Sequence, residues 1–258
     1  MVGKAMALNP THSNSYLELV IERSFDTGKS VRKRCVRILY ETLCSQPMHS
    51  ASTKMLLTLV SRSDDEDSIR EIVLGAFRDL WFNPEVRAIS AGQIALHTDM
   101  RQSGMGSDGA VNCDVPFMTL AQRVKQMLDC MAMSTAPERS RLVNVFNALL
   151  GRSDREGDNR KTFGHMATVV SVEQITELCG KMCDQLIEVL LRDDEAEGVV
   201  PVQTSGSRVA VRTCCILAMH IFCQTGAEFL VKHMTTLQPY LKLPRTASQD
   251  DLIMVQYA

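Results

Sequence analysis

Three stretches of the sequence share one pattern and decide the fold: VRKRCVRILYETL from Val31, IREIVLGAFRDLW from Ile69 and VRTCCILAMHIF from Val211. Each begins with a valine or isoleucine followed by arginine, and each has apolar residues near offsets zero, four, seven or eight, and eleven. These offsets form one stripe along an α-helix. The first two stretches begin 38 residues apart (69 − 31), close to the period of about 40 residues in HEAT-type repeats. We therefore predict an all-α, HEAT-type helical-repeat solenoid, because one helical pair cannot bury its own apolar face.

The same periodicity, followed outward from these stretches, divides the chain into five segments. Residues 15–84 are predicted to form HEAT-like helical pairs, and residues 115–150 a further helical pair. Residues 85–114 carry glycines at 92, 104, 106 and 109 and few regular apolar positions, which favours a loop or disordered insertion. Residues 151–170 are predicted to be a flexible, charged linker, and residues 171–258 to be HEAT-like helices truncated at the C-terminal end.

Turn and capping residues set the expected helix ends. Gly28 is positioned as the C-cap of a first helix, and Ser30 can cap the second helix. The Ser134-Thr135 step is expected to cap a helix that starts at Ala136. In the last segment an acidic loop is expected after Arg192, between helices at 172–192, 205–223 and 227–241.

The composition favours packed helices in an intracellular protein. Apolar residues make up 45% of the chain and aromatic residues only 5%, which suits helices filled with aliphatic side chains better than an aromatic-rich β-sandwich. The nine cysteines are odd in number and mostly lie in apolar helical patterns, which favours a reducing compartment. We find no secretory signal and no run of about 18 uncharged apolar residues, so we expect a soluble protein without a membrane partner.

A dense basic cluster is the best candidate binding site. The formal net charge is −2, so contact with nucleic acid must come from a local patch. Residues 29–37 hold five positive charges, and no acidic residue occurs from Thr27 to Tyr40. Cations near a helix N-terminus bind phosphate oxygens without reading base sequence. The predicted DNA-binding residues are Lys29, Ser30, Lys33, Arg34 and Arg37. A merely solvated basic face is the alternative, because charge runs are common on helix surfaces.

The helical angle separates these cations from an expected buried stripe. At 100° per residue the stripe consists of Val31, Cys35, Ile38 and Leu39. Asp26, Val31 and Arg32 match the signature of an inner HEAT helix, in which an Asp precedes a Val-Arg pair. Arg32 is therefore expected to be structural and to pair with Asp26 or with an acidic residue of the adjoining repeat.

Two other features of the sequence favour a structural role over ligand binding or catalysis. The acidic run at 64–68 is expected to cap a helix N-terminus, since the helix dipole attracts carboxylates there. Trp81 and Phe82 are expected to close the end of a helical pair, with contact to a partner as the alternative.

Three further patterns give no catalytic, metal or cofactor site. The sequence GMGSDG at 104–109 spells a phosphate-binding glycine pattern, but no predicted strand precedes it and no helix opens directly after it. Cys179 and Cys183 are one helical turn apart and lack a second pair at zinc spacing, which favours core packing. His220 and His233 show no nearby Cys or acid in a nucleophile arrangement.

Residues 16–84 resemble the Nipped-B family of cohesin loaders. The resemblance is carried by YLELVIERSFDTGKSVRKRCVRIL, by the spacing to Gln46-Pro47, and by DDEDSIREIVLGAFRDLWFNP. A second match lies at 230–242, where LVKHMTTLQPYLK follows the arginine-bearing helix SGSRVAVRTCCILAMHIF. Residues 85–170 between these matches fit the family poorly. Full members of this family are several times longer, so the resemblance implies a fragment.

The resemblance implies a nuclear scaffold that promotes cohesin loading on chromatin. Its expected partners are DNA, cohesin subunits and a smaller loader subunit, which is expected to bind through regions outside this chain. It implies binding without enzymatic activity and without a cofactor. A generic HEAT scaffold for unrelated proteins is the alternative, and a small enzyme built on the glycine-rich loop is a further one. DNA affinity that falls steeply with salt favours the first function.

Overall fold

The computed structural model of the 258-residue chain describes residues 10–83, 117–152, 170–197 and 205–241. These residues form helices and no β-strand, so the predicted all-α, helical-repeat fold class is confirmed. The chain divides into two compact units, Met1–Thr119 and Leu120–Ala258. The insertion predicted at 85–114 lies outside the described residues, and so does the linker predicted at 151–170 except for its two ends.

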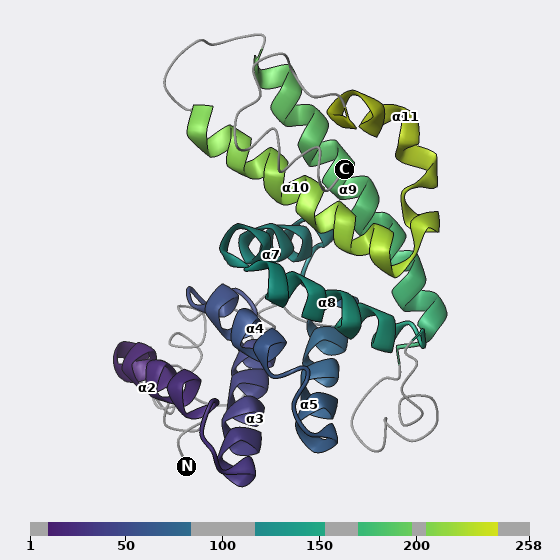
Figure 1. Ribbon diagram of the computed structural model, residues 1–258. Coiled ribbons are helices and arrows are strands. Elements are labelled where there is room, and N and C mark those ends of the chain that lie inside the picture. Colours follow the sequence, from purple (N-terminus) through teal and green to yellow (C-terminus); the bar gives the residue numbers. More distant parts are fainter. Residues whose placement is uncertain (1–9, 84–116, 153–169, 198–204, 242–258) are drawn as a thin grey trace, which may run out of the picture. The chain divides into compact units, whose positions relative to one another are not determined.

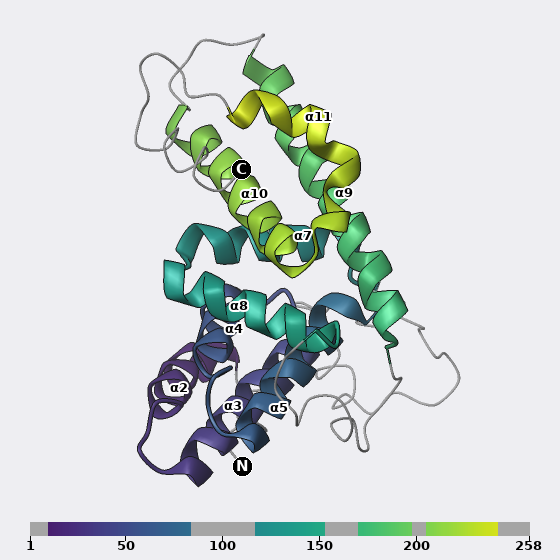
Figure 2. The same cartoon turned by 45° about the vertical axis from the view of Figure 1, so that its right-hand side comes forward.

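The first unit consists of two helical pairs (Figure 1). Its elements are α2 (Pro10–Arg23), α3 (Lys29–Ser45), α4 (Ser52–Ser61), α5 (Asp67–Phe77) and a π-helical turn, η1 (Arg78–Phe82), that continues α5. Helices α3 and α5 lie side by side in Figures 1 and 2. They run in the same direction, because Lys29 pairs with Glu66 at their N-terminal ends and Tyr40 bonds to Asp79 further along.

These parallel helices bury the same row of positions. The buried side chains of α3 are Cys35, Val36, Leu39 and Leu43. Adding the sequence period of 38 gives Val73, Leu74, Phe77 and Trp81, which are also buried. The N-caps of the two helices, Gly28 and Glu66, are separated by the same period. The repeat in the sequence is therefore a repeat in the structure.

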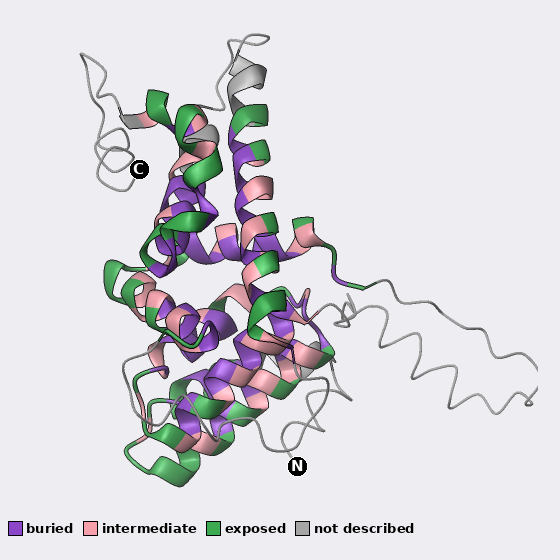
Figure 3. Cartoon of the chain, turned by 90° about the vertical axis from the view of Figure 1, so that its right-hand side faces the viewer, coloured by how far each residue is buried: buried purple, intermediate pink, exposed green. Residues whose placement is uncertain are grey.

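Aromatic side chains close the C-terminal end of the second pair. Trp81 and Phe82 are fully buried, and the ring of Trp81 meets Phe77 edge-on with centroids 4.9 Å apart. The prediction that these aromatics close the helical pair is confirmed, and the alternative of an exposed partner contact is wrong. Figure 3 shows the general rule within each unit: buried residues lie on the sides of helices that face other helices.

The N-terminal turn of α3 differs from the prediction. The preceding helix ends at Arg23, and Gly28 is the N-cap of α3, so Gly28 is not a C-cap. Ser30 lies within the first turn of α3 and does not cap it. The backbone N–H of Gly28 donates a hydrogen bond of 2.8 Å to Oδ1 of Asp26. A short Asx-type turn thus leads into the helix, and residue types alone did not reveal its register.

The buried stripe of α3 is also rotated from the predicted one. Val31 was expected in the stripe but is 40% exposed, whereas its repeat equivalent Ile69 is fully buried at 0%. Ile38 is half-buried, and Val36 is buried in its place. Spacings of three and four residues fit two neighbouring stripes on one helix, and the packing of α2, α4 and α5 around α3 selects between them.

The second unit packs two helices against two others. Its elements are α7 (Leu120–Met133), α8 (Ala136–Leu149), α9 (Val172–Glu197), α10 (Ser205–Thr225) and a C-terminal series of short turns. Helix α10 contacts α7, α8 and α9. Phe222 of α10 lies 5.5 Å from Phe146 and 6.3 Å from Phe229 between ring centroids, so aromatic contacts connect α8, α10 and the segment that follows α10.

Two residues at the ends of α8 hold it in place. The backbone N–H of Thr135 donates to Oε2 of Glu138 at 2.7 Å, so the predicted cap at Ser134-Thr135 is confirmed as a capping box. Arg152, inside the predicted linker, donates to the backbone carbonyl of Thr225 and pairs with Glu228. The first residues of that linker are therefore bound to the end of α10.

The C-terminal third departs from the predicted helix ends in two places. Helix α9 continues through Glu197, so the acidic loop expected after Arg192 is wrong at least to that residue, since alanine and glutamate sustain a helix. The single helix expected at 227–241 is also wrong. The chain forms short pieces instead: η2 (Ala227–Phe229), η3 (Val231–His233), α11 (Met234–Leu237) and η4 (Gln238–Leu241).

Candidate nucleic-acid interface

Three cations of α3 lie outside its buried row. Arg34 and Arg37 are exposed and Lys33 is half-buried. Across the described ranges, none of the three takes part in a salt bridge. We call Lys33, Arg34 and Arg37 the cation strip. Residues one helical turn apart share nearly the same side of an α-helix, so Arg37 lies close to Lys33, and Arg34 lies about 100° further around. The strip therefore covers one sector of the surface of α3.

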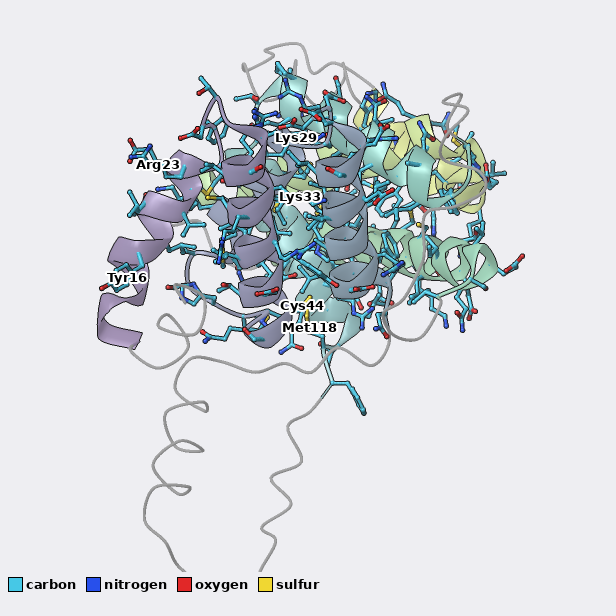
Figure 4. The ribbon with its side chains drawn as sticks, turned by 90° about the horizontal axis from the view of Figure 1, so that it is seen from below. Tyr16, Arg23, Lys29, Lys33, Cys44 and Met118 are labelled. Carbon is cyan, nitrogen blue, oxygen red and sulfur yellow. The ribbon has the colours of Figure 1, made fainter. Side chains whose placement is uncertain are left out.

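The strip begins beside α5 and turns away from it. Figure 4 shows Lys29 and Lys33 along the side of α3 that faces α5, with Cys44 further along the same side. The helical angles carry Arg37 and then Arg34 away from that side. An anion bound by all three side chains would therefore lie over the outer surface of α3.

Lys29 and Ser30, the other two residues predicted to bind DNA, lie in the first turn of α3. Lys29 forms an ion pair with Glu66, and both side chains are about half exposed, at 51% and 48%. Ser30 is exposed in the first turn of α3. Among the five predicted DNA-binding residues, Lys29 is therefore the one that pairs with a carboxylate of the described residues.

Arg32 joins the two repeats. Its Nε donates to Oδ2 of Asp65 at 2.9 Å and its Nη2 to Oδ1 at 2.8 Å, a bidentate pair in which the side chains are only 15% and 8% exposed. Its Nη1 also donates to the backbone carbonyls of Asp26 and Thr27, at 3.2 and 2.9 Å. Of the two partners expected for Arg32, the structure thus shows the acid of the adjoining repeat.

Electrostatics at this junction favour the charged forms of both carboxylates. The hydrogen bond from Arg32 holds the pKa of Asp65 below its usual value. The pKa of Asp26 is also lowered, first by the backbone N–H of Gly28 and then by Arg23, whose Nη1 lies 3.2 Å from Oδ2. Asp26 therefore orders the turn before α3, and Arg32 reaches the backbone carbonyl of Asp26 in place of its carboxylate.

The acidic run at 64–68 works only partly as predicted. Glu66 is the N-cap of α5, yet its side chain makes no capping hydrogen bond. Its carboxylate contacts Lys29, and Asp65 accepts from Arg32 and from the backbone N–H of Glu66, the latter at 2.8 Å. Glu66 therefore does not supply the predicted side-chain cap, whereas Asp67 in the first turn of α5 places a carboxylate at the helix N-terminus as predicted.

A second polar contact lies further along the same two helices. The hydroxyl of Tyr40 donates to Oδ2 of Asp79, and Nε of Arg78 donates to Oδ1 of Asp79 at 2.7 Å. Burial, followed by the bond to Asp79, raises the pKa of Tyr40. Burial also raises the pKa of Cys44 to about 12, so this thiol is protonated at neutral pH and is a poor nucleophile.

The second unit contains a polar cluster that the sequence did not reveal. Nε2 of His233 lies 2.7 Å from Oδ1 of Asp184, and Nζ of Lys232 lies 2.6 Å from the same carboxylate. Burial acts to raise the pKa of Asp184, but hydrogen bonds from Lys232 and His233 outweigh it and hold the pKa below its usual value. Lys232 and His233 follow Asp184 by 48 and 49 positions in the chain, so only folding brings them together, and they fasten η3 to α9.

The other residues considered as catalytic or metal-binding candidates either have a structural role or lie outside the described residues. Cys179 and Cys183 are fully buried in α9, which confirms their core role, and burial raises the pKa of Cys179 to about 12. The described residues contain no group of three or more His, Cys, Asp or Glu side chains able to hold a metal ion. Within the same residues, no helix has the length and apolar character needed to cross a membrane. The glycine pattern at 104–109 lies outside the described residues.

Comparisons with known proteins point to one family. The chain is 25% identical over 255 residues to Nipped-B-like protein A of Danio rerio, covering 99% of this chain and 9% of that protein. It is 23% identical over 255 residues to the Nipped-B-like protein of Homo sapiens, covering 99% and 8%. It is 24% identical over 244 residues to the Nipped-B protein of Drosophila melanogaster, covering 94% and 10%.

These alignments extend the resemblance across the middle of the chain, which matched the family poorly by its motifs. The chain spans at most about a tenth of the length of these relatives. No family model matches the chain, and no solved structure matches it. Together with the helical repeat, these alignments show that the chain is similar to several Nipped-B-like proteins over nearly all of its residues.

Proposed function

We propose that this chain is part of a nuclear cohesin-loading factor and that it binds duplex DNA through the cation strip of α3. The observation that carries the proposal is the lack of carboxylate partners for Lys33, Arg34 and Arg37 among the described residues, in a chain with a net charge of −2. Elsewhere on the surface, cations such as Lys125 and Lys181 pair with acids four residues away. Unpaired cations gathered on one helix are suited to a polyanion.

The geometry supports contact with phosphates and gives no support for base readout. The strip lies on a helix that packs beside other helices, so its side chains project from a fixed surface and α3 does not stand free to enter a groove. Lysine and arginine in such positions bind phosphate oxygens and position the duplex without selecting a sequence. Each phosphate neutralised releases counterions, so binding should weaken as salt rises. We therefore expect non-sequence-specific DNA binding.

The cohesin-related part of the function rests on the family. Cohesin subunits are proposed as partners, and loading of cohesin on chromatin is the proposed activity of the whole protein. A smaller loader subunit is proposed to bind through regions outside this chain. The structure contributes a helical scaffold on which such contacts could be built, and the cation strip is the one surface to which we assign a ligand.

The test is the salt dependence of DNA binding by the 258-residue chain. Fluorescence anisotropy with a duplex of mixed sequence gives the dissociation constant at several NaCl concentrations. Replacing all three residues, K33Q/R34Q/R37Q, should weaken binding and flatten the slope of log K against log[NaCl] by about 2.7, since each lost phosphate contact removes about 0.9.

A matched control removes the same charge elsewhere. The variant K125Q/K181Q/R192Q neutralises three cations of the second unit, each paired with an acid one turn away on its own helix. Its slope should equal that of the unmodified chain. Equal slopes for the unmodified chain and the strip variant would remove the strip from the DNA site. Binding to protein partners without any DNA affinity would favour the generic HEAT scaffold instead.

A further inference from the structure

The carboxylate of Glu66 lies at the edge of the cation strip. It comes from the N-cap of α5 and forms an ion pair with Lys29, one helical turn before Lys33 on the same side of α3. Its other oxygen lies 3.7 Å from Nη2 of Arg32. Glu66 therefore occupies the place where a bound phosphate would have to lie in order to use Lys29 together with the strip.

Glu66 and its neighbour Asp65 hold their cations in different ways. Asp65 makes two hydrogen bonds to Arg32, and both side chains are largely shielded from water. The Lys29–Glu66 pair is half exposed and has no second hydrogen bond among the described residues. Exposed pairs of this kind are weak and easily exchanged. The ion pair of Lys29 with Glu66 is therefore weak. Arg32, in contrast, makes hydrogen bonds that join the two repeats.

Several acidic residues lie near this pair. Asp64 and Asp67 are exposed and lie within two positions of Glu66, in the turn before α5 and at its start, and Glu71 is exposed further along α5. They repel a polyanion that approaches α3 from the α5 side. Arg34 and Arg37 lie away from that side, and the exposed acid near them on α3 is Glu41, one helical turn after Arg37.

We propose that Glu66 withholds Lys29 from the anion that binds the cation strip. This inference rests on the proposed DNA contact and concerns its regulation. In the unmodified chain the strip binds phosphates with three cations, and the acidic start of α5 keeps the duplex over the outer side of α3. Removing the charge of Glu66 makes Lys29 available as a fourth contact.

Charge neutralisation at Glu66 tests the inference. We expect E66Q to bind duplex DNA more tightly at low salt than the unmodified chain and to steepen the slope of log K against log[NaCl] by about 0.9, the value of one phosphate contact. That slope adds about a 3.5-fold loss of affinity between 50 and 200 mM NaCl. The matched control is E71Q, which removes one exposed negative charge from α5 without releasing a paired cation. Its slope should stay at the unmodified value, and circular dichroism confirms that both variants are folded.

The double variant K29Q/E66Q assigns the gain to Lys29. The steepening seen with E66Q should disappear in it. Equal slopes for E66Q and E71Q, or a gain that survives the loss of Lys29, overturn the inference. These results are independent of the strip variant: if K33Q/R34Q/R37Q leaves DNA binding unchanged, the proposed DNA site fails, while a Lys29-dependent gain in E66Q still supports withholding by Glu66.

Discussion

Helices α3 and α5 are equivalent in the repeat, yet they present opposite charges to solvent. Both bury the same four positions, one repeat period apart, and both begin at equivalent N-caps. Outside the buried row, α3 carries Lys33, Arg34 and Arg37, whereas α5 carries Glu71 at the position equivalent to Lys33 (33 + 38). The start of α5 is acidic and pairs with the start of α3 through Lys29 and Arg32.

This comparison shows that the fold requires the buried row but does not require the charges outside it. A row shared by both helices is needed for packing, because each repeat must bury that face against its neighbours. The outer charges are not shared, so packing does not explain them. One part of the α3 charge is structural, since Arg32 joins the repeats. Lys29 pairs with Glu66, and the cation strip has no carboxylate partner among the described residues.

The largest expected effect comes from the shared row. Phe77→Ala should lower the free energy of unfolding by about 3–5 kcal/mol, and Leu39→Ala, at the equivalent position of α3, by about 2–5 kcal/mol, because both leave a cavity in a fully buried site. Urea unfolding followed by far-UV circular dichroism measures both. Losses below about 1 kcal/mol in either helix would show that the two rows are not equivalent in packing.

Substitutions at the equivalent positions Val31 and Ile69 should have different effects on the free energy of unfolding. Ile69→Ala is expected to lower the free energy of unfolding by about 2–5 kcal/mol, because this side chain is fully buried. Val31→Ala should change it by no more than about 0.5 kcal/mol, because the side chain is 40% exposed. The same urea experiment compares the two, and similar losses would mean that Val31 is buried in solution.

The junction between the repeats should be sensitive to acid. Asp65 has a lowered pKa in the folded chain, so its contribution to stability is fully present above the pKa of an unfolded aspartate, about 3.9, and is lost as pH falls through the lower folded value. Asp65→Asn should lower stability at pH 7 by less than the core substitutions do. It should also flatten the loss of stability below about pH 4.

Thermal unfolding at several pH values from 7 to 2 provides that comparison. Glu71→Gln is a suitable control, because Glu71 is exposed and forms no salt bridge among the described residues. A pH profile of Asp65→Asn that matches the profile of the unmodified chain would show that the Arg32–Asp65 pair does not join the repeats.

Each substitution in the cation strip should have a small effect on stability. K33Q/R34Q/R37Q is expected to change the free energy of unfolding by less than about 0.5 kcal/mol per substitution, since these side chains have no described ion-pair partner to lose. Urea unfolding of the triple variant measures this directly. A loss comparable with that of Leu39→Ala would give the strip a structural role and make altered DNA binding uninformative.

The sequence predicted the repeat because the buried row recurs at a fixed spacing. Ile69, Val73 and Phe77 lie at the predicted offsets zero, four and eight and are buried, whereas Leu74 and Trp81 lie one position beyond the predicted offsets. The sequence also indicated that Arg32 would form an ion pair. It did not distinguish the acids that could bind this arginine, because the choice of Asp65 depends on how α5 lies beside α3.

Predictions failed where the deciding contact is distant or backbone-mediated. Gly28 and Ser30 were both assigned as caps, but an Asx turn at Asp26 sets the register of α3. The segment after Gly226 has helical spacing of apolar residues, yet it folds as short turns whose Lys232 and His233 reach Asp184 on α9. A contact between segments so far apart in the chain leaves no local pattern from which to predict it.

Chemical footprinting of Lys33 tests the central claim most directly. Lysines of the 258-residue chain are acetylated with and without saturating duplex DNA, and modification is measured by mass spectrometry. Bound phosphate should protect Lys33 and leave Lys125 of the second unit, which pairs with Asp129, unchanged. Equal acetylation of Lys33 with and without DNA, at a concentration where the duplex is bound, would contradict the assignment of the outer face of α3 as the DNA-binding surface.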